Sequence, residues 1–147
     1  MCKGLHNQVI QAEFREQFGT LFDAVAESTA PPQSQRALRA EVIRSESELA
    51  ELVARIRAVG RVAFDTETDS LVLPQARLVG LSFAIEEGEG FYVPVRSPEP
   101  GTHLSTDGAL ALLKPLLEDA AVAKVGHNLK YDHAVLANHG VELRGIA

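Results

Sequence analysis

The segment VAFDTETDSL (residues 62–71) joins a short apolar run to a group of acidic and hydroxyl side chains. The apolar run, Val62 to Phe64, predicts a buried strand, and side chains two positions apart on a strand point to the same face. Asp65 and Glu67 therefore project together from the end of this strand. Neighbouring carboxylates repel each other, whereas Mg²⁺ and Mn²⁺ prefer such oxygen ligands. The segment predicts a metal site, and a polar turn after the strand is the simpler alternative.

A second polar segment, GHNLKYD (residues 126–132), follows another apolar run and leads into a predicted helix. Asn128, Tyr131 and Asp132 are spaced i, i+3 and i+4, which places them on one helical face. An amide, a phenol and a carboxylate on one face suit a site that holds a metal and a nucleotide. The alternative is that Asn128 only caps the helix and that Asp132 is exposed to solvent.

The pattern on either side of these segments predicts an α/β fold. Apolar runs alternate with amphipathic stretches, and glycines mark the turns. The expected strands are 39–43, 61–64, 78–85, 91–95 and 122–126, and the expected helices are 45–60, 105–117 and 128–138. The strands at 78–85 and 91–95 form a hairpin, so the sheet is mixed, and we expect helices on both of its faces.

The N-terminal residues form a separate unit in this interpretation. Residues 7–27 carry apolar side chains at helical spacing, which predicts a helix that packs on a core or docks a partner. Two prolines among small polar residues make 28–35 a linker. The predicted domains are therefore 1–38, a helix with a Pro-containing linker, and 39–147, the α/β domain.

Composition narrows the class of protein. The chain has 147 residues, 46% of them hydrophobic, one cysteine and a net charge of −6. A single cysteine excludes an internal disulfide and a Cys-rich zinc site. No signal peptide and no apolar run of about 18 residues is present, so we expect a cytoplasmic protein with no membrane partner. The acidic balance argues against binding to DNA chiefly through phosphate neutralisation.

The two polar segments together resemble the motifs of the 3′–5′ proofreading exonuclease domain of bacterial DNA polymerase I, in the A family of polymerases. FDTETDSL (residues 64–71) is similar to the first motif, and VGHNLKYDHAVLANHGVELRGIA (residues 125–147) to the second. The resemblance covers about residues 40–147. It implies the DEDD exonuclease superfamily and its fold: α/β, with a ribonuclease H-like mixed sheet and flanking helices.

The resemblance also implies a set of metal ligands. Asp65 matches the carboxylate that bridges two divalent ions, Mg²⁺ or Mn²⁺. Glu67 matches a ligand of the ion that activates water, and Asp132 a ligand of the second ion. The implied reaction is two-metal hydrolysis of a phosphodiester at a single-stranded 3′ end of DNA.

Five further residues match positions that contact the nucleic acid. Thr68 and Leu71 correspond to residues that line the 3′-terminal nucleotide, with Leu71 as an apolar contact to the base. His127, Asn128 and Tyr131 correspond to residues that hold the single-stranded end. His127 is a departure, because the family has a glutamine there.

The larger departure is a missing motif. The family supplies its fourth carboxylate from a Tyr-x-x-x-Asp sequence, and this chain contains none. We therefore expect a C-terminally truncated domain, a parent protein with a polymerase domain, and little activity in this chain alone.

Two other functions remain open from the sequence. One is a non-catalytic ribonuclease H-like module that binds nucleic acid or serves a structural role. The other is a related ribonuclease of the same superfamily. A metal site built from His127, His133 and His139 is disfavoured, because six residues rotate a helix by about 240° and turn successive side chains apart.

Overall fold

The computed structural model describes residues 39–99 and 101–147. The helix predicted at 7–27 and the linker at 28–35 lie outside the described residues. The elements are β1 (Arg39–Val42), α2 (Glu46–Val59), β2 (Arg61–Thr68), the short 3₁₀ helix η1 (Leu73–Gln75), β3 (Leu78–Ala84), β4 (Glu89–Pro94), α3 (Thr106–Leu117), β5 (Ala123–Val125) and α4 (Leu129–Asn138). None of the helices in this described part has the length and apolar content that crossing a membrane requires.

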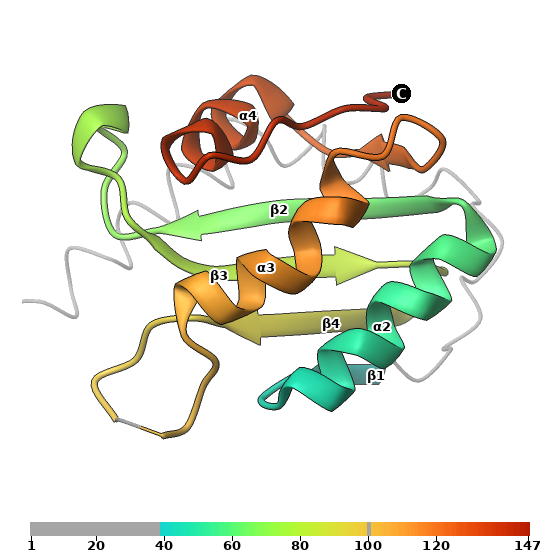
Figure 1. Cartoon of the computed structure of the whole chain (residues 1–147), viewed down its shortest axis with the longest axis horizontal. Helices are drawn as coiled ribbons and strands as arrows, with labels where there is room; N and C mark the ends of the chain where they lie inside the picture. Colours follow the sequence, from blue (N-terminus) through green and yellow to red (C-terminus); the bar gives the residue numbers. More distant parts are fainter. Residues whose placement is uncertain (1–38, 100) are drawn as a thin grey trace, which may run out of the picture. The chain divides into compact units, whose positions relative to one another are not determined.

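The strands form a five-stranded sheet in the order β1-β4-β3-β2-β5 (Figure 1). β3 is antiparallel to both β2 and β4, whereas β1 pairs with β4, and β5 with β2, in parallel. The mixed α/β sheet predicted from the sequence is confirmed. β2 continues to Thr68, beyond the predicted end at 64, because pairing with β3 extends past the apolar run.

The helix α2 illustrates how local sequence signals set an element's bounds. Ser45 and Glu48 form the capping box that closes its first turn. Gly60 ends the helix in the left-handed conformation with φ of 74°, which costs a glycine little. Leu49, Leu52 and Ile56 form its buried stripe.

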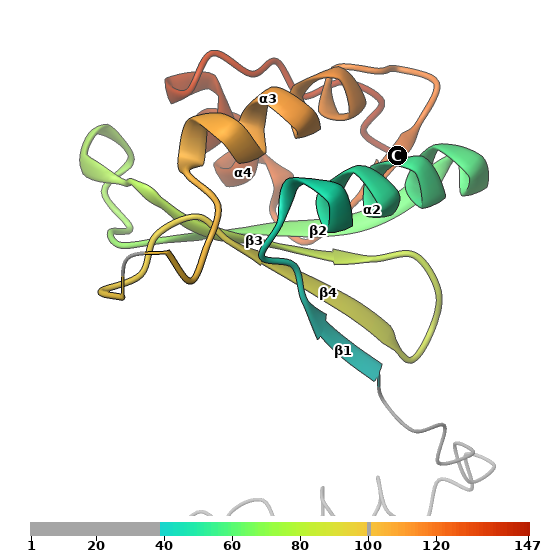
Figure 2. The same cartoon turned by 60° about the horizontal axis from the view of Figure 1, so that its bottom comes forward.

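All of the described helices α2, α3 and α4 lie on one side of the sheet (Figure 2). Along β2, Val62, Phe64 and Thr66 are buried beneath them, and the alternate residues, including Asp65 and Glu67, are exposed. The expectation of helices on both faces is therefore wrong for the described residues. The physical reason is that β2 presents carboxylates, not apolar side chains, on its other face.

Candidate active site

Asp132 on α4 lies against the edge of β2. Its side chain is buried, with 1% of the residue exposed, and its Oδ1 accepts hydrogen bonds from the Thr66 amide at 2.8 Å and the Thr66 hydroxyl at 2.7 Å. β5 pairs with β2 only as far as Ala63, so the Thr66 amide has no partner strand on that side. The Asp132 carboxylate accepts the hydrogen bond from the Thr66 amide that a neighbouring strand would otherwise accept. The alternative of a solvent-exposed Asp132 is wrong.

The connection from β5 to α4 sets this position. A Cβ added to Gly126 would lie 2.8 Å from the Phe64 carbonyl oxygen and 2.5 Å from Leu129 Cδ2, so the chain passes closely over β2. Asn128 follows in the left-handed conformation, with φ of 57°, and its side chain makes no capping hydrogen bond. The alternative that Asn128 only caps the helix is therefore wrong. The turn places the first helical residues, including Asp132, over the edge of β2.

Asp65 and Asp132 form a carboxylate pair. Partial desolvation raises the pKa of Asp65, and the negative charge of Asp132 and a side-chain contact with it raise this pKa further. A 3.1 Å hydrogen bond from the Thr66 amide to Asp65 Oδ1 and, after it, the charge interaction with His127 offset part of this effect. A divalent cation would remove the repulsion between the two carboxylates, so this donor set fits the ions that the sequence implies.

Glu67 lies on the same face of β2 as Asp65 but is not part of the Asp65–Asp132 pair. Within residues 39–99 and 101–147, no three His, Cys, Asp or Glu side chains come close enough together to hold an ion. Burial and, after it, the charge of Glu67 raise the pKa of Tyr92, so the Glu67 carboxylate lies near that phenol. The structure therefore brings together two of the three predicted ligands.

The predicted nucleic-acid contacts surround a network at the end of β2. The Tyr131 hydroxyl lies 2.6 Å from the Thr68 hydroxyl and donates a 2.8 Å hydrogen bond to the Ser70 carbonyl oxygen. Thr68 Oγ1 also lies 3.0 Å from that carbonyl oxygen, and its single hydroxyl proton serves either this contact or the one to Tyr131. Leu71 follows with 89% of its surface exposed, which leaves its side chain free to contact a ligand. His127 and Asn128 are also exposed.

Thr66 is a site residue that the sequence did not predict. This residue is 6% exposed and holds Asp132 by both its amide and its hydroxyl. A signal was present, because strand alternation places Thr66 on the same face as Val62 and Phe64, where an apolar residue is the norm. A threonine there indicates a buried polar partner.

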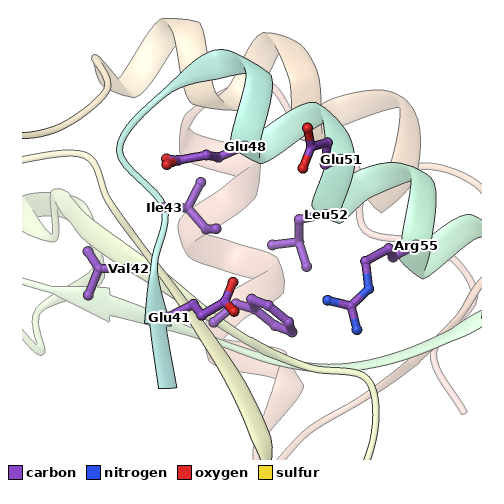
Figure 3. A pocket seen from close by; sticks show the side chains of 8 residues that line it. Glu41, Val42, Ile43, Glu48, Glu51, Leu52 and Arg55 are labelled. Atoms are coloured by element: carbon purple, nitrogen blue, oxygen red, sulfur yellow. The ribbon is translucent and has the colours of Figure 1, made fainter. Parts of the chain in front are cut away.

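Two clefts lie near other parts of the described sheet. One, of about 320 Å³, lies between β1 and α2 at the far edge (Figure 3), where Arg55 stacks 5.1 Å over the Phe91 ring and pairs with Glu89 at 2.7 Å. None of the predicted site residues lines it. The other, of about 540 Å³, is lined by Asn128 and His133 among others, next to the start of α4.

The mixed sheet with its flanking helices has the α/β ribonuclease H-like fold. Solved structures agree on the fold: RNase D of Trypanosoma brucei matches 74% of this chain and 37% of its own with a TM-score of 0.61 at 20% identity. RNase D of Escherichia coli matches 70% of this chain and 25% of its own with a TM-score of 0.53 at 23% identity.

The sequence comparisons identify the family. The model of the 3′–5′ exonuclease family of A-family DNA polymerases matches residues 40–147. DNA polymerase I of Pseudomonas aeruginosa is 36% identical over 145 residues, which cover 93% of this chain and 16% of that protein. DNA polymerase I of Rhizobium leguminosarum is 40% identical over 121 residues, covering 69% of this chain and 12% of that protein. The chain belongs to the 3′–5′ exonuclease family of DNA polymerase I, and it spans less than a fifth of the length of these relatives.

Proposed function

We propose that this chain forms the exonuclease part of a cytoplasmic DNA polymerase I and removes nucleotides from a single-stranded 3′ end of DNA. The polymerase domain belongs to the parent protein in this proposal. The reaction is hydrolysis of the terminal phosphodiester with two divalent ions, Mg²⁺ or Mn²⁺.

The observation that supports this proposal most strongly is the meeting of Asp65 and Asp132. Asp132 lies 66 positions along the chain from Thr66, and yet it is hydrogen-bonded to it beside the Asp65 carboxylate. Burying a charged group next to another of the same sign is costly, and a purely structural site has no need for it. Perturbed carboxylates of this kind cluster at functional sites.

Asp65, Glu67 and Asp132 are the residues that would hold the ions. Ions bound there would lower the pKa of a water and stabilise the leaving 3′-oxygen. The chain itself supplies preorganisation: Thr66 fixes Asp132 by two hydrogen bonds, and strand geometry fixes the spacing of Asp65 and Glu67.

The strand end would be held by Thr68, Leu71, His127, Asn128 and Tyr131. The 2.6 Å contact between the Thr68 and Tyr131 hydroxyls joins the end of β2 to α4, so these two residues form one continuous contact surface. Leu71 presents an exposed apolar side chain on which a terminal base can pack. Such contacts bind a frayed strand without bulk positive charge, which agrees with the net charge of −6.

The test is the stepwise shortening of a 5′-labelled single-stranded DNA from its 3′ end in Mg²⁺ or Mn²⁺, using the protein as it is encoded. Replacing Asp132→Asn is expected to lower the rate by about 10²-fold or more, by analogy with loss of a preorganised electrostatic group. The matched control is Asp107→Asn, which removes the same charge from an exposed position in the first turn of α3. It is expected to leave the rate unchanged.

Two results would overturn the proposal in different ways. Equal rates for Asp132→Asn and the unaltered protein would favour the non-catalytic module. Degradation of an RNA of the same sequence in place of the DNA would favour the related ribonuclease.

A further inference from the structure

The exposed face of the sheet carries one aromatic side chain whose position the proposed reaction does not explain. Tyr92 lies on β4 directly opposite Ser82 of β3, which in turn lies opposite Asp65 of β2. Residues directly opposite in antiparallel strands share a face. Tyr92 therefore projects on the side of the sheet that carries Asp65 and Glu67.

The Tyr92 ring extends diagonally across β3 over Gly80. A Cβ built on Gly80 would lie 2.3 Å from Tyr92 Oη, 2.5 Å from its Cζ and 2.6 Å from its Cε2. The phenol thus occupies the space that a side chain at position 80 would fill. Only glycine leaves room for this placement.

Gly80 is the residue directly opposite Glu67 in the pairing of β2 with β3. Cβ atoms of such opposite residues lie about 4.5–5.5 Å apart. Tyr92 Oη lies 2.3 Å from where a Cβ of residue 80 would stand, so the hydroxyl is next to the Glu67 side chain on this face of the sheet. In agreement with this geometry, the charge of Glu67 adds to the effect of burial in raising the pKa of Tyr92.

From this arrangement we propose that Tyr92 is a positioning residue, whose hydroxyl holds the Glu67 carboxylate in the orientation that binds a divalent ion beside Asp65. The inference rests on the proposed function, in which Glu67 is an ion ligand. Ligating carboxylates are commonly held by hydrogen bonds from neighbouring groups, and removing such a group costs about 10–100-fold in metal affinity. Tyr92 itself makes no contact with substrate in this proposal.

The experiment measures Mn²⁺ affinity by electron paramagnetic resonance of the free ion, with the protein as encoded and without nucleic acid. Tyr92→Phe keeps the ring over Gly80 and removes only the hydroxyl. It is expected to weaken Mn²⁺ binding about tenfold, at the low end of that range, with an unchanged melting temperature. In a Glu67→Gln background the same substitution is expected to have no further effect, because the group through which Tyr92 acts is gone.

Two further variants control for packing and for the loss of a hydroxyl. Gly80→Ala places a Cβ 2.3 Å from the Tyr92 hydroxyl position, and it is expected to weaken Mn²⁺ binding although Tyr92 is still present. Thr106→Val removes a hydroxyl that contacts the Val95 carbonyl oxygen, outside the candidate site. This variant is expected to leave Mn²⁺ affinity unchanged.

The outcomes separate this inference from the function on which it rests. If Glu67→Gln weakens Mn²⁺ binding and Tyr92→Phe does not, the role of Tyr92 is refuted and the proposed function stands. A tenfold loss from Tyr92→Phe that persists in the Glu67→Gln background would also refute it, because Tyr92 would then act by another route. If neither Glu67→Gln nor Asp132→Asn changes Mn²⁺ binding, the proposed metal site itself is wrong.

Discussion

At the scale of single residues, the site depends on how a buried carboxylate is accommodated. Asp132 is buried, but Thr66 offers it two donors, so part of the lost hydration is replaced. Asp65 beside it accepts a longer, 3.1 Å hydrogen bond from the same Thr66 amide, and desolvation together with the charge of Asp132 raises its pKa. Without a cation, the Asp65 carboxyl therefore loses its proton at a higher pH than an ordinary aspartate does.

The first prediction concerns the pH dependence of stability of the metal-free protein. A raised pKa means that the folded state binds the Asp65 proton more tightly than the unfolded state, so stability falls as pH rises above the ordinary value of about 4. Asp65→Asn removes this loss. Thermal unfolding in the presence of a chelator should show the variant more stable than the unaltered protein at pH 7, with the difference vanishing at about pH 4 and below.

Asp69 provides the control, because its pKa is shifted in the direction opposite to that of Asp65. Hydrogen bonds from the Arg77 backbone and side chain, with the Arg77 charge, lower the pKa of Asp69 despite partial desolvation. Its contribution to stability is present above about pH 4 and is lost as pH falls through its lowered pKa. Asp69→Asn should therefore be less stable than the unaltered protein at pH 7. If both variants shifted in the same direction at pH 7, the explanation by local pKa would fail.

The second prediction tests Thr66 as the residue that holds Asp132. Thr66→Val keeps the side-chain shape but leaves the buried Asp132 oxygen with one donor fewer, so the free energy of unfolding should fall by about 1–3 kcal/mol. The comparison is Thr106→Val, which removes a long 3.4 Å hydrogen bond to the Val95 carbonyl oxygen. Chemical denaturation should show a clearly smaller loss for Thr106→Val; equal losses would mean that the Thr66 hydroxyl has no special role.

At the scale of elements, the sequence predicted what depends on local pattern. The capping box at Ser45 and the glycine at position 60 set the bounds of α2, and the alternation along β2 predicted that Asp65 and Glu67 share a face. Other features depend on partners that a sequence pattern does not reveal. β2 extends to Thr68 because β3 pairs with it there, and the helices gather on one side because the other face carries carboxylates.

The candidate site also depends on contacts that a sequence pattern does not reveal. The spacing of residues 128–132 predicted one shared helical face, but Asn128 adopts a left-handed conformation before the helix begins. The sequence identified Asp65 and Asp132 as partners only through a resemblance. The contact itself arises from the short length of β5, which leaves the edge of β2 open to a side chain from α4.

The third prediction concerns the close passage between β5 and α4. Gly126→Ala would force a Cβ to within 2.8 Å of the Phe64 carbonyl oxygen, so either the strand or the helix must shift. We expect a loss of about 1–3 kcal/mol in the free energy of unfolding, typical of overpacking, together with reduced nucleotide release as Asp132 moves.

Gly90→Ala is the matched control for this variant. A Cβ at Gly90 meets nothing within 4 Å, and the position is in a strand, where alanine is tolerated better than glycine. Its stability should be unchanged or slightly raised. A Gly126→Ala protein with the stability and activity of Gly90→Ala would show that the approach of α4 to β2 has no part in forming the site.

At the scale of the whole molecule, the described fold is a platform on which two of the proposed ion ligands meet. The carboxylates stand on the exposed face and at the edge of one sheet, with the helices packed behind. Within the described residues two carboxylates meet, and in the 147-residue sequence no Tyr-x-x-x-Asp motif occurs to add a fourth. The last prediction follows from this count of ligands.

The 147 residues by themselves should release nucleotides from single-stranded DNA only slowly. A missing ion ligand and a missing group that orients water should each cost roughly 10²–10³-fold in rate, by analogy with the loss of a preorganised donor. The measurement compares this chain with a longer protein that contains it together with a Tyr-x-x-x-Asp motif, on the same 3′ end in Mn²⁺. Comparable rates would mean that a carboxylate within these residues completes the site.

Asp69 is poorly placed to be that carboxylate, because its Oδ1 accepts from the Arg77 amide at 2.8 Å and its Oδ2 from Arg77 Nε at 3.1 Å. An ion would have to displace both contacts, so Asp69→Asn should leave the residual activity of the isolated chain unchanged.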